Sequence, residues 1–106
     1  MSLVGTYHSS EVNSTFIVTE ANDANGQGKG TIEISGITIP VTIHYHFENN
    51  VGPQTDLWFA GNKDNPNEYV GGAGTTSNQN YDVIKIAGGY PDGTDVLAFE
   101  GNYKRQ

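Results

Sequence analysis

The strongest structural signal in the sequence is a strict alternation of apolar and other residues between positions 37 and 47. The apolar positions are Ile37, Ile39, Val41, Ile43, Tyr45 and Phe47, and Thr38, Pro40, Thr42, His44 and His46 lie between them. A period of two residues puts these sets on opposite faces of a β-strand, so the apolar set can face a core. Because Pro40 has no N–H to donate to a sheet, we expect a bulge, a bend or an unpaired edge there.

Seven other segments have the alternation or the residue types of strands. We expect strands over residues 3–9, 14–20, 30–35, 37–47, 55–61, 68–74, 81–87 and 95–103. The segments between them are rich in Asn, Asp, Gly and Pro, which are typical of turns. In particular, residues 21–30 and 88–93 are expected to be loops. No stretch has the apolar spacing of an amphipathic helix.

Eight short strands joined by hairpin-like connections predict an all-β fold with one domain over residues 1–106. We expect an eight-stranded antiparallel up-and-down β-barrel, and a two-sheet β-sandwich is the alternative. Closure of a barrel removes exposed sheet edges. Eight strands also leave an interior wide enough for side chains or for one small ligand, so this shape suits small-molecule binding.

The composition excludes several classes of function. Twelve acidic and five basic residues give a net charge of -7, and the only adjacent basic pair is Lys104-Arg105. A protein that binds nucleic acid needs clustered cations, so we expect no nucleic-acid partner and no membrane partner. The absence of cysteine excludes disulfides and thiolate chemistry. The opening Met-Ser-Leu is not a signal sequence and no segment has the apolar length of a transmembrane helix, so the compartment is left open.

Two motifs near the start of the chain resemble the first hairpin of the avidin and streptavidin family. They are Gly5-Thr6-Tyr7 and the string Ser14-Thr15-Phe16-Ile17-Val18-Thr19. Shorter similarities follow in strand order at residues 30–32, 57–62 and 69–72. The resemblance implies an eight-stranded barrel that forms dimers or tetramers and holds biotin in its open end. It also favours a secreted or periplasmic protein.

The resemblance implies a set of ligand-binding residues as well. Ser14 corresponds to the serine that binds the ureido oxygen in the family, and Glu100 corresponds to a carboxylate in strand eight, although Gly101 or Asn102 aligns there as well. Ile32 stands where the family has a ureido-binding tyrosine. The implied ligand site consists of Ser10, Val12, Ser14, Ile32, Trp58, Glu100 and Asn102.

The chain departs from the family pattern in its aromatic residues. Trp58 is its one tryptophan, whereas the biotin cage of the family uses three or four, and Tyr7 lies where a tryptophan is usual. A large aromatic side chain buries about 150–250 Å² at about 25 cal/mol per Å², so the missing rings would remove many kcal/mol of ligand contact. We therefore expect a barrel that binds a small molecule with a polar head. Biotin is a possible ligand, but tight binding is not expected.

Metal binding and catalysis have little support in the sequence. His44 and His46 project from the same face of one strand and could share a metal ion, but a third ligand such as His8 or Glu33 would be needed. Histidines on a surface or interface are the simpler explanation, so we expect no metal. The serines are not set in a Gly-x-Ser-x-Gly turn and the carboxylates are scattered, so we expect no enzyme.

Carbohydrate recognition is the alternative function. Amide and carboxylate side chains in the Asn-, Asp- and Gly-rich loops could bind sugar hydroxyls, with Trp58 or Tyr90 stacked on the ring of the sugar. The same residue types are what any β-turn uses. Trp58 lies mid-strand, so a place in the core or in a subunit contact is also compatible with the pattern. A barrel with no ligand is the third possibility.

Overall fold

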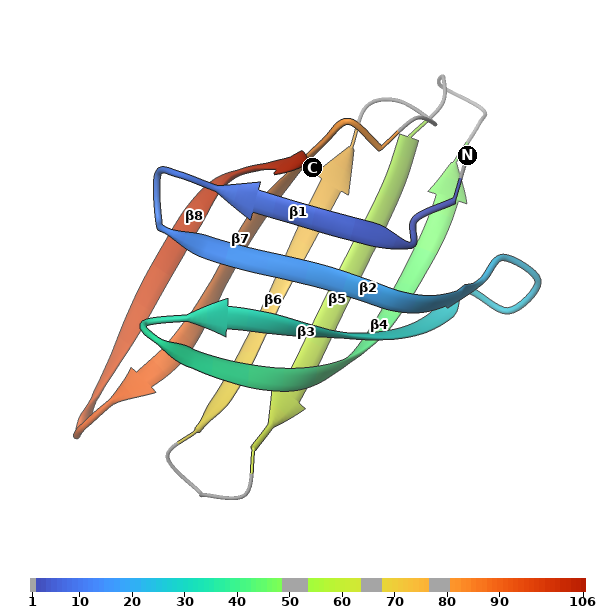
Figure 1. The fold of residues 1–106 in the computed structure, drawn as a ribbon. Helices are drawn as coiled ribbons and strands as arrows, with labels where there is room; N and C mark the ends of the chain where they lie inside the picture. The colour runs from blue at the N-terminus through green and yellow to red at the C-terminus, as the bar shows by residue number, and fades with distance from the viewer. Residues whose placement is uncertain (1, 49–53, 64–67, 77–80) are drawn as a thin grey trace.

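The computed structural model describes residues 2–48, 54–63, 68–76 and 81–106, which form eight strands and no helix (Figure 1). The strands are β1 (Gly5–Ser9), β2 (Ser14–Asn22), β3 (Gln27–Ile34), β4 (Ile37–Glu48), β5 (Gln54–Asn62), β6 (Tyr69–Thr76), β7 (Val83–Asp92) and β8 (Asp95–Arg105). Each strand pairs antiparallel with the next, and β1 pairs with β8 to close the sheet. This confirms the predicted up-and-down barrel and excludes the sandwich. Within these ranges, no helix has the length and apolar character that crossing a membrane requires.

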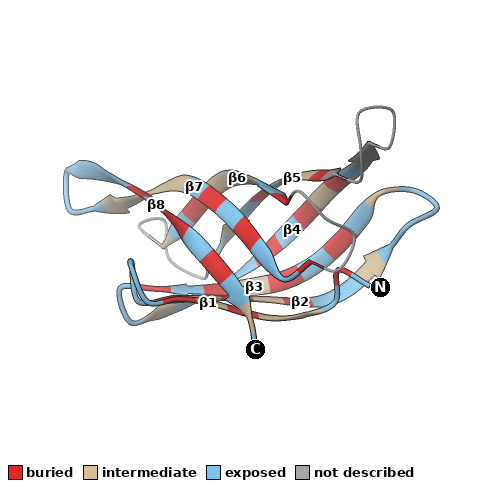
Figure 2. Ribbon diagram, turned by 90° about the horizontal axis from the view of Figure 1, so that it is seen from above, coloured by how far each residue is buried: buried red, intermediate tan, exposed pale blue. Residues whose placement is uncertain are grey.

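The alternation seen in the sequence separates the two faces of the barrel wall. On β2, Ser14, Phe16 and Val18 are buried, whereas Thr19 is exposed. The buried bands repeat along most strands (Figure 2). At the centre of the core, the ring of Phe16 lies 6.4 Å from that of Tyr7 and 5.3 Å from that of Phe59. The interior around Phe16 is therefore packed with large side chains.

Strands β3 and β7 extend into segments that the sequence predicted to be loops, because several glycines there serve close packing and not turns. β3 already begins at Gln27 and β7 continues to Asp92. A Cβ atom on Gly30 would overlap the carbonyl oxygen of Ile17, and one on Gly88 would lie 2.8 Å from Cζ of Phe99. Only a residue without a side chain fits such positions. The expected loops at 21–30 and 88–93 therefore shrink to short hairpin turns.

Pro40 causes no irregularity in the pairing of β3 with β4, where it lies opposite Thr31. The pairing of β4 with β5 begins one residue later, with Val41 opposite Gly61. Of the three outcomes expected at Pro40, the unpaired edge fits this register best. The irregularity in register lies instead in β2, between Val18 and Glu20.

Candidate functional site

Three buried hydroxyl groups meet inside the barrel beneath the turn that joins β1 to β2. Ser9 and Ser14 are opposite each other in the pairing of these strands. Tyr103 comes from β8, and the pairing of His8 with Lys104 brings it next to Ser9. None of these three side chains has any exposed surface, and we call Ser9, Ser14 and Tyr103 the hydroxyl cluster.

Two of the three hydroxyl groups in the cluster lack a hydrogen-bond partner. The Ser14 hydroxyl donates to the carbonyl oxygen of Glu33 at 2.7 Å. Ser9 Oγ and the Tyr103 hydroxyl are the two buried side-chain oxygens in the described part of the chain that have no partner. Each such group costs about 1–3 kcal/mol if it stays unpaired. Buried polar groups in native proteins normally bind a water or a ligand, so the cluster is a candidate binding site.

The Tyr103 hydroxyl keeps its proton at neutral pH. Burial raises the pKa of this group, and the neighbouring Ser14 hydroxyl lowers it in part. Ser14 donates its hydrogen to Glu33, and the geometry between the Ser14 and Tyr103 hydroxyls is not that of a hydrogen bond. Tyr103 is therefore available as a donor to any group that enters the cluster.

The absence of a side chain at Gly101 makes the space that Ser9 occupies. A Cβ atom on Gly101 would lie 2.7 Å from Ser9 Oγ and 3.6 Å from Cγ2 of Val12. Val12 belongs to the turn between β1 and β2 and packs against the core. The turn thus covers the hydroxyl cluster, and the N–H of Asn102 holds it on β8 by donating to a carboxylate oxygen of Glu11 at 2.8 Å.

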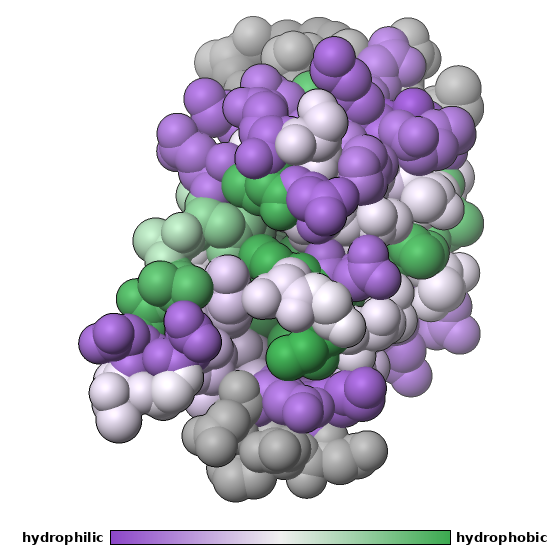
Figure 3. All heavy atoms as spheres, turned by 60° about the vertical axis from the view of Figure 1, so that its left-hand side comes forward, coloured by the Kyte–Doolittle hydropathy of each residue, from purple (hydrophilic) through white to green (hydrophobic). Residues whose placement is uncertain are grey.

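An apolar wall leads from the hydroxyl cluster towards the β7–β8 hairpin. The inward positions of β8 after Gly101 are Phe99 and Leu97, whose exposure rises from 8% to 40%. The ring of Tyr90 lies 6.1 Å from that of Phe99. On this side of the molecule, apolar surface is bordered by hydrophilic residues (Figure 3). Along β8, the hydroxyl group of Tyr103 is therefore followed by the apolar side chains of Phe99 and Leu97.

The polar groups near the opposite end of the barrel have partners. The Tyr7 hydroxyl donates to the carbonyl oxygen of Leu3 at 2.6 Å and accepts from Nη1 of Arg105 at 2.9 Å. The Tyr45 hydroxyl donates to Asp23 Oδ1 at 2.6 Å. Burial raises the pKa of Tyr7 to about 12 and also raises that of Tyr45, with the Asp23 carboxylate as a further cause. These groups stabilise the fold and are not free to bind a ligand.

The structure separates the residues of the site that the family resemblance implies. Ser14 lies in the hydroxyl cluster, Val12 covers it, and Ile32 is buried in the core. Ser10 is exposed in the turn between β1 and β2.

Trp58, Glu100 and Asn102 are exposed on the outer face of the wall, because their neighbours in the strands face inward. They do not line the barrel interior, which corrects that part of the implied site.

Sequence reasoning missed Ser9 and Tyr103, although a signal for both was present. Ser9 has the same parity as Tyr7 in β1, and Tyr103 has the same parity as Phe99 in β8. Alternation therefore places both side chains inside the barrel. Applying the same alternation to the polar residues as well as to the apolar ones would have identified the hydroxyl cluster.

The histidines of β4 do not form a metal site with the described residues. No group of three or more His, Cys, Asp or Glu side chains in these ranges is placed to hold a metal ion. The ring of His44 stacks on that of Trp58, with centroids 5.6 Å apart and planes inclined by 13°. Of the proposed third ligands, His8 contacts the Thr15 hydroxyl through Nδ1 at 2.9 Å, and Glu33 lies far along β3 from the partner of His44.

The fold and the hydroxyl cluster define a closed antiparallel barrel with a polar site at one end of an apolar interior. No protein-family model matches the chain, and no curated protein or solved structure matches it.

Replacing a tyrosine by phenylalanine should have different effects at the two ends of the barrel. Tyr7→Phe removes the partner of Leu3 and Arg105, so we expect a loss of about 1–3 kcal/mol in the free energy of unfolding. Tyr103→Phe removes an unpaired hydroxyl, so we expect no loss, or a gain of up to about 1 kcal/mol. Urea unfolding of both variants measures the difference. Equal losses would show that the Tyr103 hydroxyl is hydrogen-bonded in the free protein.

Proposed function

We propose that this protein binds a small neutral molecule through a carbonyl-type oxygen held by the hydroxyl cluster. The observation that carries the proposal is the pair of buried hydroxyls, Ser9 and Tyr103, that lack partners in the described residues. Both can donate a hydrogen bond, and a carbonyl oxygen can accept two. The apolar body of the ligand would extend along Val12, Phe99 and Leu97 towards the hairpin.

The surroundings of the cluster favour a neutral ligand and a binding role without catalysis. The buried polar residues of the described chain, apart from tyrosines, are Ser9, Ser14, Thr55 and Thr76. None of these carries a charge, so a charged head group would be buried without a counter-ion, which is costly. General acid–base catalysis would also need a group that titrates near neutral pH, and serine and threonine do not.

Ligand entry would require the turn between β1 and β2 to move, because the hydroxyl cluster has no exposed surface. Movement of the turn would break the hydrogen bond from Asn102 to Glu11 and separate Val12 from the core. The hydrogen bond is exposed and Val12 is one partly buried side chain, so this movement costs little free energy compared with opening the core. The turn therefore provides a route to the cluster that leaves the strands paired.

Biotin is the first probe for this site, because its ureido carbonyl matches the two donors. The one tryptophan of the chain is on the outer face, so the interior offers less aromatic contact than the biotin cage of the family that the sequence resembles. We expect calorimetry to give a dissociation constant between about 1 μM and 1 mM. A value weaker than about 1 mM, which corresponds to about 4 kcal/mol, would remove biotin as the ligand.

Matched variants locate the binding. Ser9→Ala and Tyr103→Phe should each weaken the affinity about tenfold, while Trp58→Ala on the outer face should leave it unchanged. The broader proposal is tested with 2-imidazolidinone, a bare cyclic urea, by nuclear magnetic resonance. If about 10 mM of this probe leaves the resonances of Ser9, Gly101 and Tyr103 unmoved, the cluster is not a carbonyl site.

A further inference from the structure

The outer face of β5 to β8 carries a row in which two small residues separate two large ones. Trp58 on β5 is opposite Ala73 on β6, Ala73 is opposite Ala87 on β7, and Ala87 is opposite Glu100 on β8. Since neighbouring strands lie about 4.8 Å apart, Trp58 and Glu100 stand about 14 Å apart with only methyl groups between them. The result is a hollow of about 490 Å³, which we call the outer trough. It is lined by Asp56, Leu57, Trp58, Ala73, Gly74, Thr75, Lys85, Ala87 and Glu100.

Trp58 forms one wall of the outer trough and is unusually open for a tryptophan in the middle of a strand. Its side chain is 52% exposed, and the imidazole of His44 stacks against it from the β4 side. The stacking restrains the plane of the indole ring before any ligand arrives. A restrained ring loses little conformational freedom on binding, which favours affinity.

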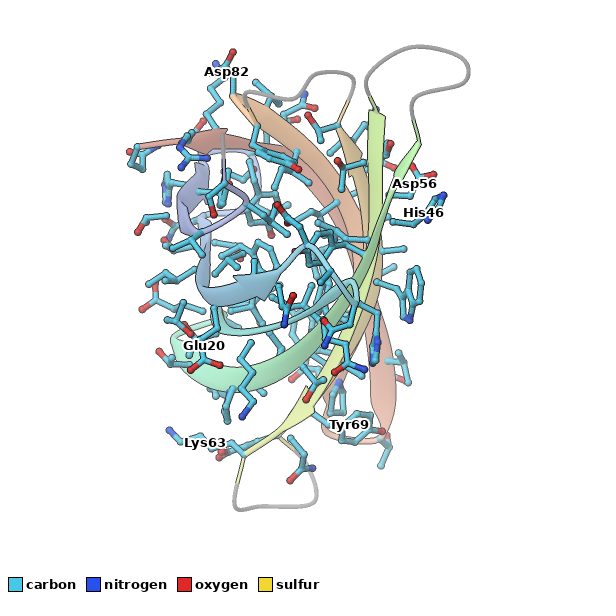
Figure 4. The ribbon with its side chains drawn as sticks, turned by 90° about the vertical axis from the view of Figure 1, so that its right-hand side faces the viewer. Glu20, His46, Asp56, Lys63, Tyr69 and Asp82 are labelled. Carbon is cyan, nitrogen blue, oxygen red and sulfur yellow. The ribbon has the colours of Figure 1, made fainter. Side chains whose placement is uncertain are left out.

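Polar groups lie along the opposite wall and the floor of the trough. Lys85 and Glu100 are exposed, and no hydrogen bond or ion pair engages either of them among the described residues. The Thr75 hydroxyl donates to Asp56 Oδ1 at 2.8 Å. Asp56 lies on the outer side of the wall together with His46 (Figure 4). The trough thus offers the ammonium group of Lys85 and the carboxylate of Glu100 across from an aromatic face, with a second carboxylate, Asp56, on the strand of Trp58.

We propose that the outer trough is a binding site for a neutral oligosaccharide, separate from the hydroxyl cluster. A sugar ring has an apolar face that can stack on Trp58 and equatorial hydroxyls that can reach Lys85 and Glu100. An anionic ligand is disfavoured by the carboxylates of Asp56 and Glu100 and by the net charge of -7. A purely aromatic ligand would stack equally well but would leave the polar wall unpaired.

A second exposed aromatic residue on the same face favours a chain of sugars over a single ring. Tyr69 on β6 is 45% exposed and lies four residues along that strand from Ala73, a distance of about 14 Å. Between these positions, the next outer row has Ala60 opposite Gly71. The surface from Trp58 to Tyr69 is therefore flat, with an aromatic ring at each end. An oligosaccharide can contact both rings, whereas one sugar ring cannot.

Fluorescence tests this proposal directly, because Trp58 is the only tryptophan of the chain and all tryptophan emission comes from the trough. The probes are cellohexaose, maltohexaose and chitohexaose, each titrated to about 10 mM. At least one of them should shift the emission to shorter wavelength in a saturable manner. No shift with any of the three would overturn the proposal.

Variants test whether the ligand occupies the trough. Calorimetry with the responding hexaose should show at least a roughly tenfold loss of affinity in Trp58→Ala, a smaller loss in Tyr69→Ala or Glu100→Ala, and no change in Tyr103→Phe. Full affinity in Trp58→Ala would contradict the proposal.

Dilution of the protein without sugar tests whether a second copy of the chain covers the trough. Light scattering measures the molecular mass during dilution. If a dimer dissociates and the tryptophan emission shifts over the same range of concentration, a second copy of the chain covers this face and the proposal fails.

Discussion

Phe16→Ala is expected to lower the free energy of unfolding by about 3–5 kcal/mol, because it removes the ring at the centre of the barrel. Phe16 has no exposed surface, and its ring packs between those of Tyr7 and Phe59. The eight strands enclose this position on all sides, so the wall can collapse only partly into the space left by the ring. For a domain of this size, the midpoint of thermal unfolding should fall by about 15–30 °C.

The matched control is Ile17→Ala, one residue further along the same strand. Ile17 is half-buried on the outer face, so it should lose about 1 kcal/mol or less. Circular dichroism during heating measures both variants. A larger loss in Ile17→Ala than in Phe16→Ala would mean that β2 is shifted by one residue from this register, since such a slip exchanges the inner and outer faces of a strand.

The sequence predicted the barrel well because most strands have one buried face and one exposed face. In β4, every second residue from Ile39 to Tyr45 is buried, as the alternation indicates. In a strand of this kind, the residues that face the core can be identified from the sequence alone. The number of strands and their order in the closed sheet followed from eight such segments and the turns between them.

The sites were less predictable, because alternation is weakest where they lie. Leu57, Trp58 and Phe59 are three successive apolar residues, so the sequence gives no indication of which one faces outward. The structure buries Leu57 and Phe59 and exposes Trp58.

The same ambiguity affects β8, where Leu97, Ala98 and Phe99 are also successive apolar residues. There the resemblance favoured Glu100 and left Gly101 and Asn102 as alternatives, and the pleat of the strand puts Gly101 and Tyr103 inside. The resemblance alone did not determine which residues of this strand face the interior.

The outward position of Trp58 links the two proposals. Because Trp58 does not face the interior, the aromatic residues beside the hydroxyl cluster are Tyr90 and Phe99. This arrangement suits a small ligand bound with moderate affinity. On the outer face, the indole ring of Trp58 lies beside a surface formed by alanine and glycine residues, where a ligand ring can stack on it. The two sites use opposite faces of one wall and share no residue. Variants in one site can therefore serve as controls for the other.

Alkaline pH is expected to destabilise the fold steeply, because tyrosines inside the barrel must stay neutral. Burial raises the pKa of Tyr7 to about 12 and also raises that of Tyr103, whereas tyrosine in an unfolded chain titrates near pH 10. A raised pKa in the folded state means that the stabilisation is complete below about pH 10 and is lost as the pH rises towards 12. Tyr7 should therefore cost about 1.4 kcal/mol per pH unit in that window, and Tyr103 acts in the same direction.

Tyr7 should remove about 1.4 kcal/mol of the free energy of unfolding by about pH 11, and Tyr103 and Tyr45 act in the same direction. Urea unfolding at a series of pH values from about 8 to 11 measures the slope. Tyr103→Phe is the decisive comparison, because it removes one titrating group and should make the slope shallower. An unchanged slope in this variant would show that the Tyr103 hydroxyl ionises as readily in the barrel as in water, and the hydroxyl cluster would then be open to solvent.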